Sequence, residues 1–223
     1  MDKFDLMILD FDGVVLDSEV TAHEALIEAI EEEFQVEFDL EFILDEFVGY
    51  AQGEVPRILE RIVGRKLTDS FIKNYREKID NAVSNDSKLV RGIDKIIREQ
   101  EIPICIASNS PKERIKEHLR KSGLLSYLEN RIFSANDTSR AKPYPDIYLH
   151  TAKKMNVAPQ NCLVIEDSPI GVKAAVAANM TVFGYSKITD SNKLYDAGAI
   201  HTFKSMKMLF EEIKLYEYRQ ASL

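Results

Sequence analysis

The chain has 223 residues, of which 45% are hydrophobic, and its formal net charge is −8 at pH 7. This length suits one large domain or a core with a small second domain, and the apolar fraction is sufficient for a packed core. The acidic balance argues against nucleic acids and anionic membranes as partners, because a negatively charged surface does not attract them.

The start of the chain and its two cysteines are typical of a cytoplasmic protein. Acidic residues interrupt the short apolar run at the N-terminus, so it lacks the form of a signal peptide. No stretch approaches the roughly 18 consecutive apolar residues that a membrane-spanning helix needs. Cys105 and Cys162 each lie within an apolar run. We interpret them as reduced, buried side chains; a redox pair is the alternative.

Short apolar runs alternate along the chain with helical patterns, which predicts a mostly parallel sheet built from βαβ units. The predicted strands comprise residues 6–9, 102–107, 131–133, 162–165, 181–185 and 200–203. Most of these runs are almost continuously apolar, as expected for strands that helices cover on both faces. The predicted helices around them comprise residues 112–121, 146–155, 169–179 and 206–218. The predicted fold class is therefore α/β, with a Rossmann-like parallel sheet.

Two of the predicted helices begin with a serine followed by a proline. Ser110-Pro111 and Ser168-Pro169 each combine a capping side chain with a residue suited to the first helical position. Each follows a predicted strand closely. Ligands of open α/β sheets bind at this edge, where strands end and helices begin.

One long segment interrupts the alternation of strands and helices. Its pattern is helical throughout, with predicted helices at residues 18–33, 55–63 and 68–83. We interpret residues 17–86 as a small helical domain inserted into an α/β core made of residues 1–16 and 87–223. Its hinges are expected near residues 16–19 and 85–89, the second of which is polar and typical of a loop.

Acidic pairs follow two of the predicted strands. Asp10 and Asp12 come directly after the first strand, and Glu166 and Asp167 directly after the strand that begins at Cys162. Carboxylates at the ends of buried strands are costly without a counter-charge, which a bound cation would supply. If the two strands are neighbours, the acids converge and provide the oxygen ligands that Mg²⁺ prefers. Acids serving only turns are the alternative for either pair alone.

Polar residues at two other loops add the features of an anion site. Ser108 follows a strand and precedes a helix, so its hydroxyl and the neighbouring N–H groups could bind an anion. Lys142 lies in an extended loop before Pro143, where its charge could offset phosphate and carboxylates. A simple helix cap and a solvated lysine are the alternatives when each residue is taken singly.

Taken together, these residues resemble the four motifs of haloacid dehalogenase phosphatases. Residues 10–15 (DFDGVV) are similar to the first motif, Ser108-Asn109 to the second, Lys142-Pro143 to the third and residues 166–168 (EDS) to the fourth. Their order and spacing are those of the family, and the helical insert is similar to its cap domain. Residues 152–171 resemble the branch with β-phosphoglucomutase and sugar-phosphate phosphatases, particularly 6-phosphogluconate phosphatase-like enzymes.

The resemblance implies a phosphoric monoester hydrolase that uses Mg²⁺. Asp10 is implied as the nucleophile that forms an aspartyl phosphate, and Asp12 as the acid and base of the two half-reactions. Ser108, Asn109 and Lys142 are implied as phosphate-binding residues, with Ser108 and Lys142 also stabilising the transferring group.

The same resemblance implies a metal site made of four residues. Asp10 and Asp167 bind the ion through their carboxylates and Asp12 through its backbone carbonyl. Glu166 supports the ion either directly or through a water molecule.

Three functions fit this pattern. The leading hypothesis is a phosphatase for a small phosphorylated metabolite, a sugar or sugar-acid phosphate such as 6-phosphogluconate, working as a monomer or weak homodimer. A β-phosphoglucomutase-like isomerase shares the first chemical step and is the second hypothesis. A non-catalytic binding protein is the third, and the intact motif residues argue against it. The acid/base Asp12 and the metal-site acids also argue against a dehalogenase.

Two positions depart from the mutase pattern. Similar β-phosphoglucomutases carry a histidine where this chain has Ala22, with His23 one position later, and one helical step turns a side chain by about 100°. They also carry an arginine where this chain has Gln52, unless a shifted alignment lets Arg57 supply that charge.

Other residues of the insert are interpreted more simply. His23 is expected on the surface of the first inserted helix, although it could instead face the active site. The loop at residues 49–56 could contact substrate. The arginines and lysines of the insert are expected to be mostly solvated.

Overall fold

The structure is a computed structural model that describes residues 4–47, 55–86, 88–99 and 102–221. The chain divides into two compact units, one comprising Met1–Leu16 and Leu89–Leu223, the other Asp17–Lys88. The first unit contains the large sheet and the second contains helices α1 to α4. Within the described residues, no helix combines the length and the apolar character needed to cross a bilayer.

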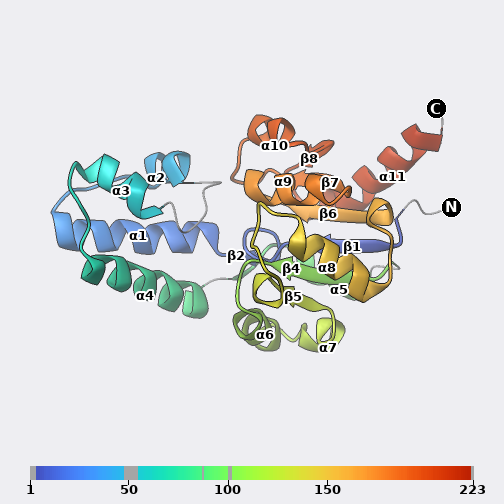
Figure 1. The fold of residues 1–223 in the computed structure, drawn as a ribbon, viewed down its shortest axis with the longest axis horizontal. Helices are drawn as coiled ribbons and strands as arrows, with labels where there is room; N and C mark the ends of the chain where they lie inside the picture. The colour runs from blue at the N-terminus through green and yellow to red at the C-terminus, as the bar shows by residue number, and fades with distance from the viewer. Residues whose placement is uncertain (1–3, 48–54, 87, 100–101, 222–223) are drawn as a thin grey trace. The chain divides into compact units, whose positions relative to one another are not determined.

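The first unit is built on a six-stranded sheet in the order β5-β4-β1-β6-β7-β8 (Figure 1). Every strand pairs with its neighbours in parallel, and β1 lies between β4 and β6. The strands are β1 (Leu6–Leu9), β4 (Ile104–Ser108), β5 (Ile132–Ser134), β6 (Cys162–Glu166), β7 (Thr181–Tyr185) and β8 (His201–Phe203). The predicted α/β fold class is confirmed.

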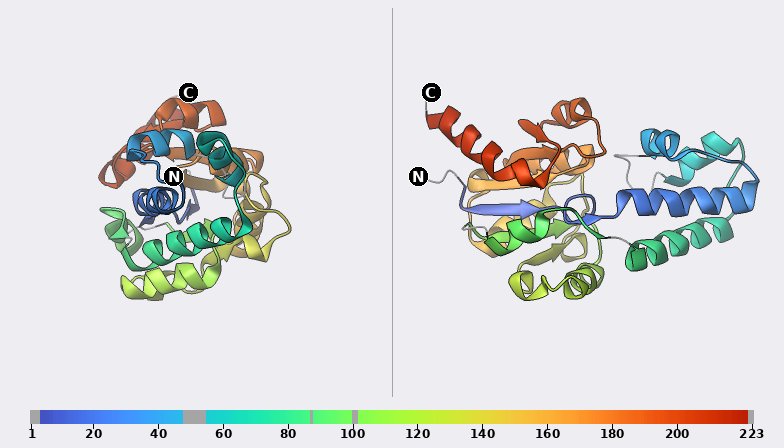
Figure 2. Two further views of the ribbon diagram at one scale, coloured as in Figure 1. Left: turned by 90° about the vertical axis from the view of Figure 1, so that its left-hand side faces the viewer. Right: turned by 180° about the vertical axis from the view of Figure 1, so that it is seen from behind.

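Helices pack against both faces of this sheet. Figure 1 shows α8 and α9 in front of it, and the view from behind in Figure 2 shows α5 and α11 on the other side. The helices of the unit are α5 (Ile93–Glu99), α6 (Lys112–Lys121), α7 (Leu125–Leu128), α8 (Asp146–Met155), α9 (Pro169–Ala177), α10 (Ser191–Ala197) and α11 (Leu209–Ala221).

The ends of two predicted helices required correction. The helix predicted at residues 169–179 ends at Ala177, because Asn179 adopts a left-handed backbone with φ of 59°. The helix predicted at residues 206–218 begins as a 3₁₀ turn, Met206–Met208, before α11. The two cysteines are free and buried, as predicted.

Every second side chain of the central strands β1 and β6 points to the face of the sheet that packs against α8. Leu6, Ile8 and Val164 belong to a buried cluster that includes side chains of α8, α9 and α10. Successive side chains of a strand point to opposite faces. The next residues of the same parity, Asp10 and Glu166, are therefore directed toward α8 where β1 and β6 end.

The second unit has a core of its own. It consists of α1 (Glu19–Phe34), α2 (Leu40–Phe47), α3 (Val55–Val63) and α4 (Asp69–Asp86). The helices bury an apolar cluster that includes Ile30, Ile43, Leu59 and Phe71. The chain passes between the units at β2 (Leu16–Asp17) and β3 (Lys88–Leu89), which pair with each other.

One expectation for this unit was wrong, and another lies outside the described residues. The His23 side chain is only 12% exposed, donates a hydrogen bond from Nδ1 to the Glu19 carbonyl (2.6 Å) and lies near the ring of Phe47. Burial lowers the pKa of His23, so it is not a solvated surface histidine. The predicted substrate-contacting loop, with Gln52, falls almost wholly on residues 48–54, outside the described part.

Candidate active site

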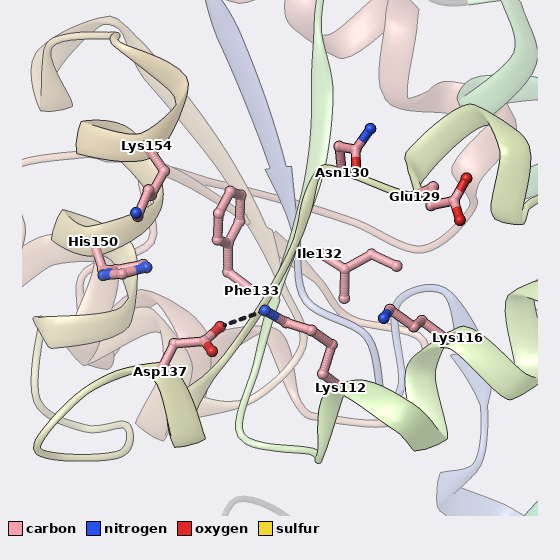
Figure 3. Close-up of a pocket in the computed structure, with 9 residues that line it drawn as sticks. All are labelled: Lys112, Lys116, Glu129, Asn130, Ile132, Phe133, Asp137, His150 and Lys154. Atoms are coloured by element: carbon pink, nitrogen blue, oxygen red, sulfur yellow. Dashed lines mark ion pairs between the residues drawn. The ribbon is translucent and has the colours of Figure 1, made fainter.

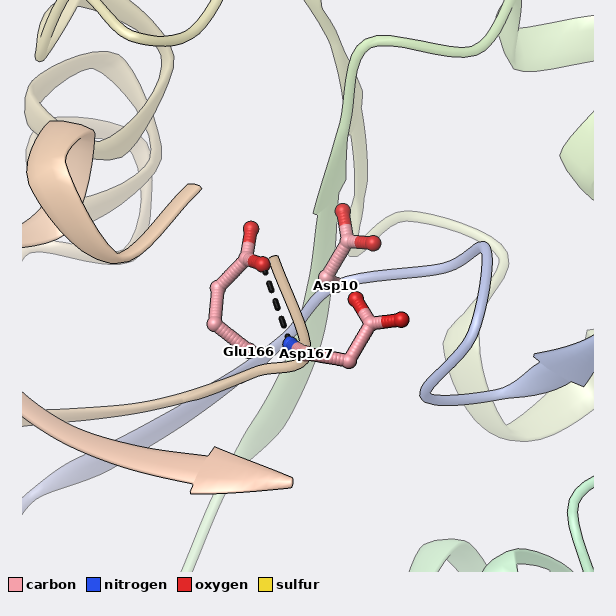
Figure 4. A group of neighbouring side chains, drawn as sticks. All are labelled: Asp10, Glu166 and Asp167. Carbon is pink, nitrogen blue, oxygen red and sulfur yellow. Dashed lines mark hydrogen bonds between the residues drawn. The ribbon is translucent and has the colours of Figure 1, made fainter. Parts of the chain in front are cut away.

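The pairing of β1 with β6 brings Asp10 together with the second acidic pair, Glu166 and Asp167. Leu9 and Ile165 are partners in this register, and the Asp10 N–H donates to the Ile165 carbonyl at 3.0 Å. Asp10 and Glu166 therefore lie on adjacent strand ends. Asp10, Glu166 and Asp167 each present a carboxylate oxygen within 4.8 Å of those of the other two (Figure 4).

Lys142 lies between two of these carboxylates. Its Nζ donates to Asp10 Oδ1 and to Glu166 Oε1, both at 2.6 Å. Burial lowers the pKa of Lys142, but Asp10 and Glu166 outweigh it, so the pKa lies well above the usual value. The lysine is therefore a buried, charged group and not the solvated side chain that its loop position would ordinarily favour.

Asp10 is buried in a crowded negative environment. Burial raises the pKa of Asp10 to about 7; Lys142 opposes this effect, whereas Glu166 and Asp12 add to it. One ammonium group faces three buried or half-buried carboxylates in this cluster. A divalent cation would relieve that imbalance.

Glu166 is held on both carboxylate oxygens. Oε1 accepts from Lys142 and from the Tyr148 hydroxyl at 2.8 Å. Oε2 accepts from the backbone N–H groups of Asp167 (3.1 Å) and Ser168 (3.2 Å) and from the Ser168 hydroxyl (3.0 Å). This full set of donors explains how a carboxylate with no exposed surface is tolerated.

Two glycines make room for the acids. A Cβ atom on Gly171, in the first turn of α9, would lie 1.7 Å from Glu166 Oε1. A Cβ atom on Gly13 would lie 1.8 Å from Asp167 Oδ2, and Gly13 also has a φ of 80°. Both positions therefore require glycine, for space at Gly171 and for space and backbone conformation at Gly13.

Replacing Gly171 with alanine is expected to destabilise the protein by about 1–3 kcal/mol, the usual cost of overpacking a buried site. This cost should exceed the roughly 1 kcal/mol that alanine gains over glycine inside a helix. Urea unfolding would measure it. Alanine at Lys173, an exposed residue of the same helix, is the control and should change stability by no more than about 0.5 kcal/mol. Equal stability of Gly171→Ala and the parent would contradict the packing argument.

The last residue of β4 and the loop that follows it supply the serine and the asparagine of the candidate site. Ser108 is 2% exposed, and its Oγ accepts from the Ser110 N–H at 3.0 Å. Asn109 Oδ1 accepts from the backbone N–H of Lys142 at 3.0 Å. Asn109 thus links this loop to the loop that carries the buried lysine.

The two predicted serine caps have different outcomes. Ser168 caps α9, accepting from the Gly171 N–H at 3.1 Å, as predicted. Ser110 does not cap α6, because Pro111 occupies the N-cap position and makes no side-chain cap. The Ser110 hydroxyl instead donates to Asp12 Oδ2 at 2.5 Å, so the expected capping role was wrong.

Two side chains at this edge were not anticipated. Arg114 of α6 forms an ion pair with Asp12 at 2.7 Å, and Tyr148 of α8 contacts Glu166 while its ring lies 4.8 Å from Lys142 Nζ. Arg114 lies one helical turn after Ser110, and this spacing was the available signal for it. Nothing in the local sequence distinguishes Tyr148 from an ordinary core aromatic.

A cavity elsewhere in the first unit is separate from the acids. It has a volume of about 480 Å³ and lies beside β5, between residues of α6 and α8 (Figure 3). Its lining includes Lys116, His150 and Lys154, and Lys112 there pairs with Asp137 at 2.9 Å. None of the predicted site residues lines it. The carboxylate cluster at the strand ends is therefore the candidate active site.

Comparison with known proteins agrees with this geometry. Residues 4–179 match the family described as haloacid dehalogenase-like hydrolase. The chain belongs to this family. The acids at the ends of β1 and β6, the serine at the end of β4 and the lysine before α8 all lie within the matched residues.

Several relatives are similar over nearly their whole length. The chain is 28% identical to 6-phosphogluconate phosphatase of Escherichia coli, covering 95% of each chain. It is 26% identical to a phosphorylated carbohydrates phosphatase of Thermotoga maritima, covering 91% of this chain and 95% of that one. Together with the family match, these relatives show that this protein is a phosphoric monoester hydrolase.

Solved structures share the fold. A haloacid dehalogenase-like protein of unknown function from Agrobacterium tumefaciens has a TM-score of 0.89 at 31% identity, covering 96% of this chain and 99% of that one. A hydrolase of the family from Deinococcus radiodurans, solved with bound phosphate and sodium, has a TM-score of 0.81 at 26% identity, covering 96% of this chain and 98% of that one. A Thermotoga maritima structure provisionally assigned as a β-phosphoglucomutase has a TM-score of 0.71 at 26% identity, covering 90% of this chain and 94% of that one.

Proposed function

We propose that this hydrolase is a Mg²⁺-dependent phosphatase of a sugar or sugar-acid monophosphate, with 6-phosphogluconate as one candidate, and that it works through an aspartyl phosphate on Asp10. The observation that supports this most is the buried Lys142 ammonium between Asp10 and Glu166. A lysine at this point holds the nucleophile in place and can neutralise charge on a transferring phosphoryl group.

In the proposed reaction, an oxygen of Asp10 attacks phosphorus, and the bond from phosphorus to the sugar oxygen breaks. Asp12 gives a proton to the leaving oxygen and then takes one from the water that hydrolyses the aspartyl phosphate. Ser108 and Lys142 hold the phosphoryl oxygens, while Asn109 fixes the backbone of Lys142. The helical unit is proposed to act as a cap that excludes water from the first step.

The acidic cluster fits Mg²⁺, because it offers several hard oxygen donors close together with an excess of negative charge. Asp10 and Asp167 would hold the ion, with the Asp12 carbonyl as a further ligand. Glu166 is proposed as a supporting residue, since its oxygens already accept five hydrogen bonds. When bound, the ion supplies positive charge against the phosphoryl group.

The second candidate is a β-phosphoglucomutase-like isomerase, and the similarity to the Thermotoga maritima structure favours it. Such an enzyme must also bind the second phosphate of a sugar bisphosphate. A neutral Gln52, in place of the arginine expected in that branch, cannot make a charged bidentate contact with phosphate. Ala22 likewise replaces the expected histidine. These two positions favour transfer to water.

We therefore expect steady release of inorganic phosphate from a sugar or sugar-acid monophosphate. We expect no efficient interconversion of β-glucose 1-phosphate and glucose 6-phosphate, even with glucose 1,6-bisphosphate present. A panel of phosphorylated metabolites with Mg²⁺ would test the first outcome, and a coupled glucose 6-phosphate assay the second. Isomerisation much faster than phosphate release would favour the mutase instead.

A further inference from the structure

The carboxylate of Asp12 is held by Ser110, which precedes α6, and by Arg114 in the first turn of that helix. Arg114 donates from Nη2 to Asp12 Oδ1 at 2.7 Å and from Nη1 to Asp12 Oδ2 at 3.3 Å. Ser110 Oγ donates to Asp12 Oδ2 at 2.5 Å, and Arg114 Nη1 also donates to Ser110 Oγ at 2.6 Å. The three side chains form a closed set of hydrogen bonds.

This arrangement restricts the orientation of Asp12. A guanidinium group that meets both oxygens of a carboxylate fixes its plane as well as its position, which a lysine cannot do. The two side chains are only 20% and 25% exposed. The pair therefore differs from the largely exposed ion pairs of the surface, such as Lys95 with Glu99, which contribute little to the stability of a folded protein.

The helix that carries Arg114 is itself firmly anchored. Ile115 and Leu119 of α6 have no exposed surface. One turn after Arg114, the buried His118 ring lies 6.0 Å from the ring of Phe11, the residue before Asp12. Arg114 and His118 thus lie on the face of α6 that meets residues 11–12. A rigid helix face is a suitable support for a group that must be precisely oriented.

We propose that Arg114, assisted by Ser110, is a positioning residue that orients the Asp12 carboxyl group for proton transfer. This inference rests on the proposed function. A proton donor must lie within about 2.6–3.2 Å of the oxygen that it protonates, so a freely rotating Asp12 would rarely be productive. Arg114 acts through Asp12 and is given no contact with substrate.

The test compares two leaving groups through kcat/KM, which reports the steps up to release of the alcohol. A sugar alkoxide needs a proton from Asp12 as it departs, whereas p-nitrophenolate departs without one. We expect Arg114→Gln to lower kcat/KM by about 10- to 100-fold for the best sugar monophosphate, within the range of general acid catalysis. The loss with p-nitrophenyl phosphate should be less than about 3-fold, on the same reasoning.

Two further variants sharpen the comparison. Arg114→Lys keeps the positive charge but loses the planar guanidinium group. Its selective loss of kcat/KM for the sugar monophosphate should therefore lie between those of the parent and Arg114→Gln. Arg120→Gln makes the same chemical change at an exposed position of α6 and should leave both kcat/KM values unchanged. Thermal unfolding would show whether each variant folds.

The outcomes separate this inference from the proposed function. If the parent protein releases no phosphate from any monoester, the proposed function fails. If the parent is active but Arg114→Gln lowers kcat/KM equally for both esters, or for neither, the positioning role is overturned. Should Arg114→Gln fail to fold, Ser110→Ala provides the same comparison, with an expected selective loss of about 3- to 10-fold for the sugar ester. An equal effect of Ser110→Ala on both esters would also overturn the inference.

Discussion

Replacement of Asp10 by asparagine is expected to lower kcat by about three orders of magnitude or more, as deletion of a nucleophile usually does. Asparagine preserves the shape of the side chain but cannot attack phosphorus as a carboxylate. It also removes the negative charge that pairs with Lys142 Nζ and weakens one of the proposed metal ligands. The loss should therefore appear with every monoester that the parent hydrolyses, whatever its leaving group.

The measurement is phosphate release by protein free of host phosphatases. Asp196→Asn is the matched control, because Asp196 is an exposed residue of α10 outside the acidic cluster, and it should retain the parent rate. Retention of more than about a tenth of the parent kcat by Asp10→Asn would exclude Asp10 as the nucleophile.

Removal of divalent metal is expected to abolish activity, and Mg²⁺ should restore it. Asp10, Glu166 and Asp167 carry more negative charge than Lys142 can neutralise, so the protein alone lacks part of the positive charge that phosphoryl transfer needs. Ca²⁺ should restore activity poorly, because its coordination shell is larger and less regular. Full activity in thoroughly chelated buffer would contradict the metal requirement.

Thermal unfolding supplies a second readout of this site that does not depend on turnover. Without metal, burial raises the pKa of Asp10 to about 7, from an ordinary value of 3.8. The folded state therefore holds a proton that the unfolded state releases, and ionised Asp10 reduces stability as pH rises from about 4 through 7. A cation bound beside the ionised Asp10 would offset this loss of stability. The increase in Tm caused by Mg²⁺ should thus be larger at pH 8 than at pH 6.

Variants connect this shift to the proposed ligands. Asp167→Asn and Asp10→Asn should reduce the increase in Tm, whereas Asp196→Asn should show the parent increase. An increase that is equal at both pH values, or unchanged in Asp167→Asn, would place Mg²⁺ elsewhere on the protein.

Most of the strands and helices that carry the site could be predicted from the amino-acid sequence alone. Nearly continuous apolar runs identified β1 and β6, because strands that helices cover on both faces have little place for polar residues. The acids that follow those runs stood out for the same reason. Short helices such as α7 and α10 were missed, since a few residues do not establish a helical period.

The partner of each charged side chain, in contrast, is evident only from the three-dimensional fold. Lys142 reaches Asp10 across 132 positions of the chain, and Arg114 reaches Asp12 across 102. Ser110 had the local pattern of a helix cap, but its hydroxyl bonds to Asp12. Local patterns reflect the conformational preferences of neighbouring residues. The pairing of distant charges follows instead from strand register and helix packing, which place side chains together that no local pattern relates.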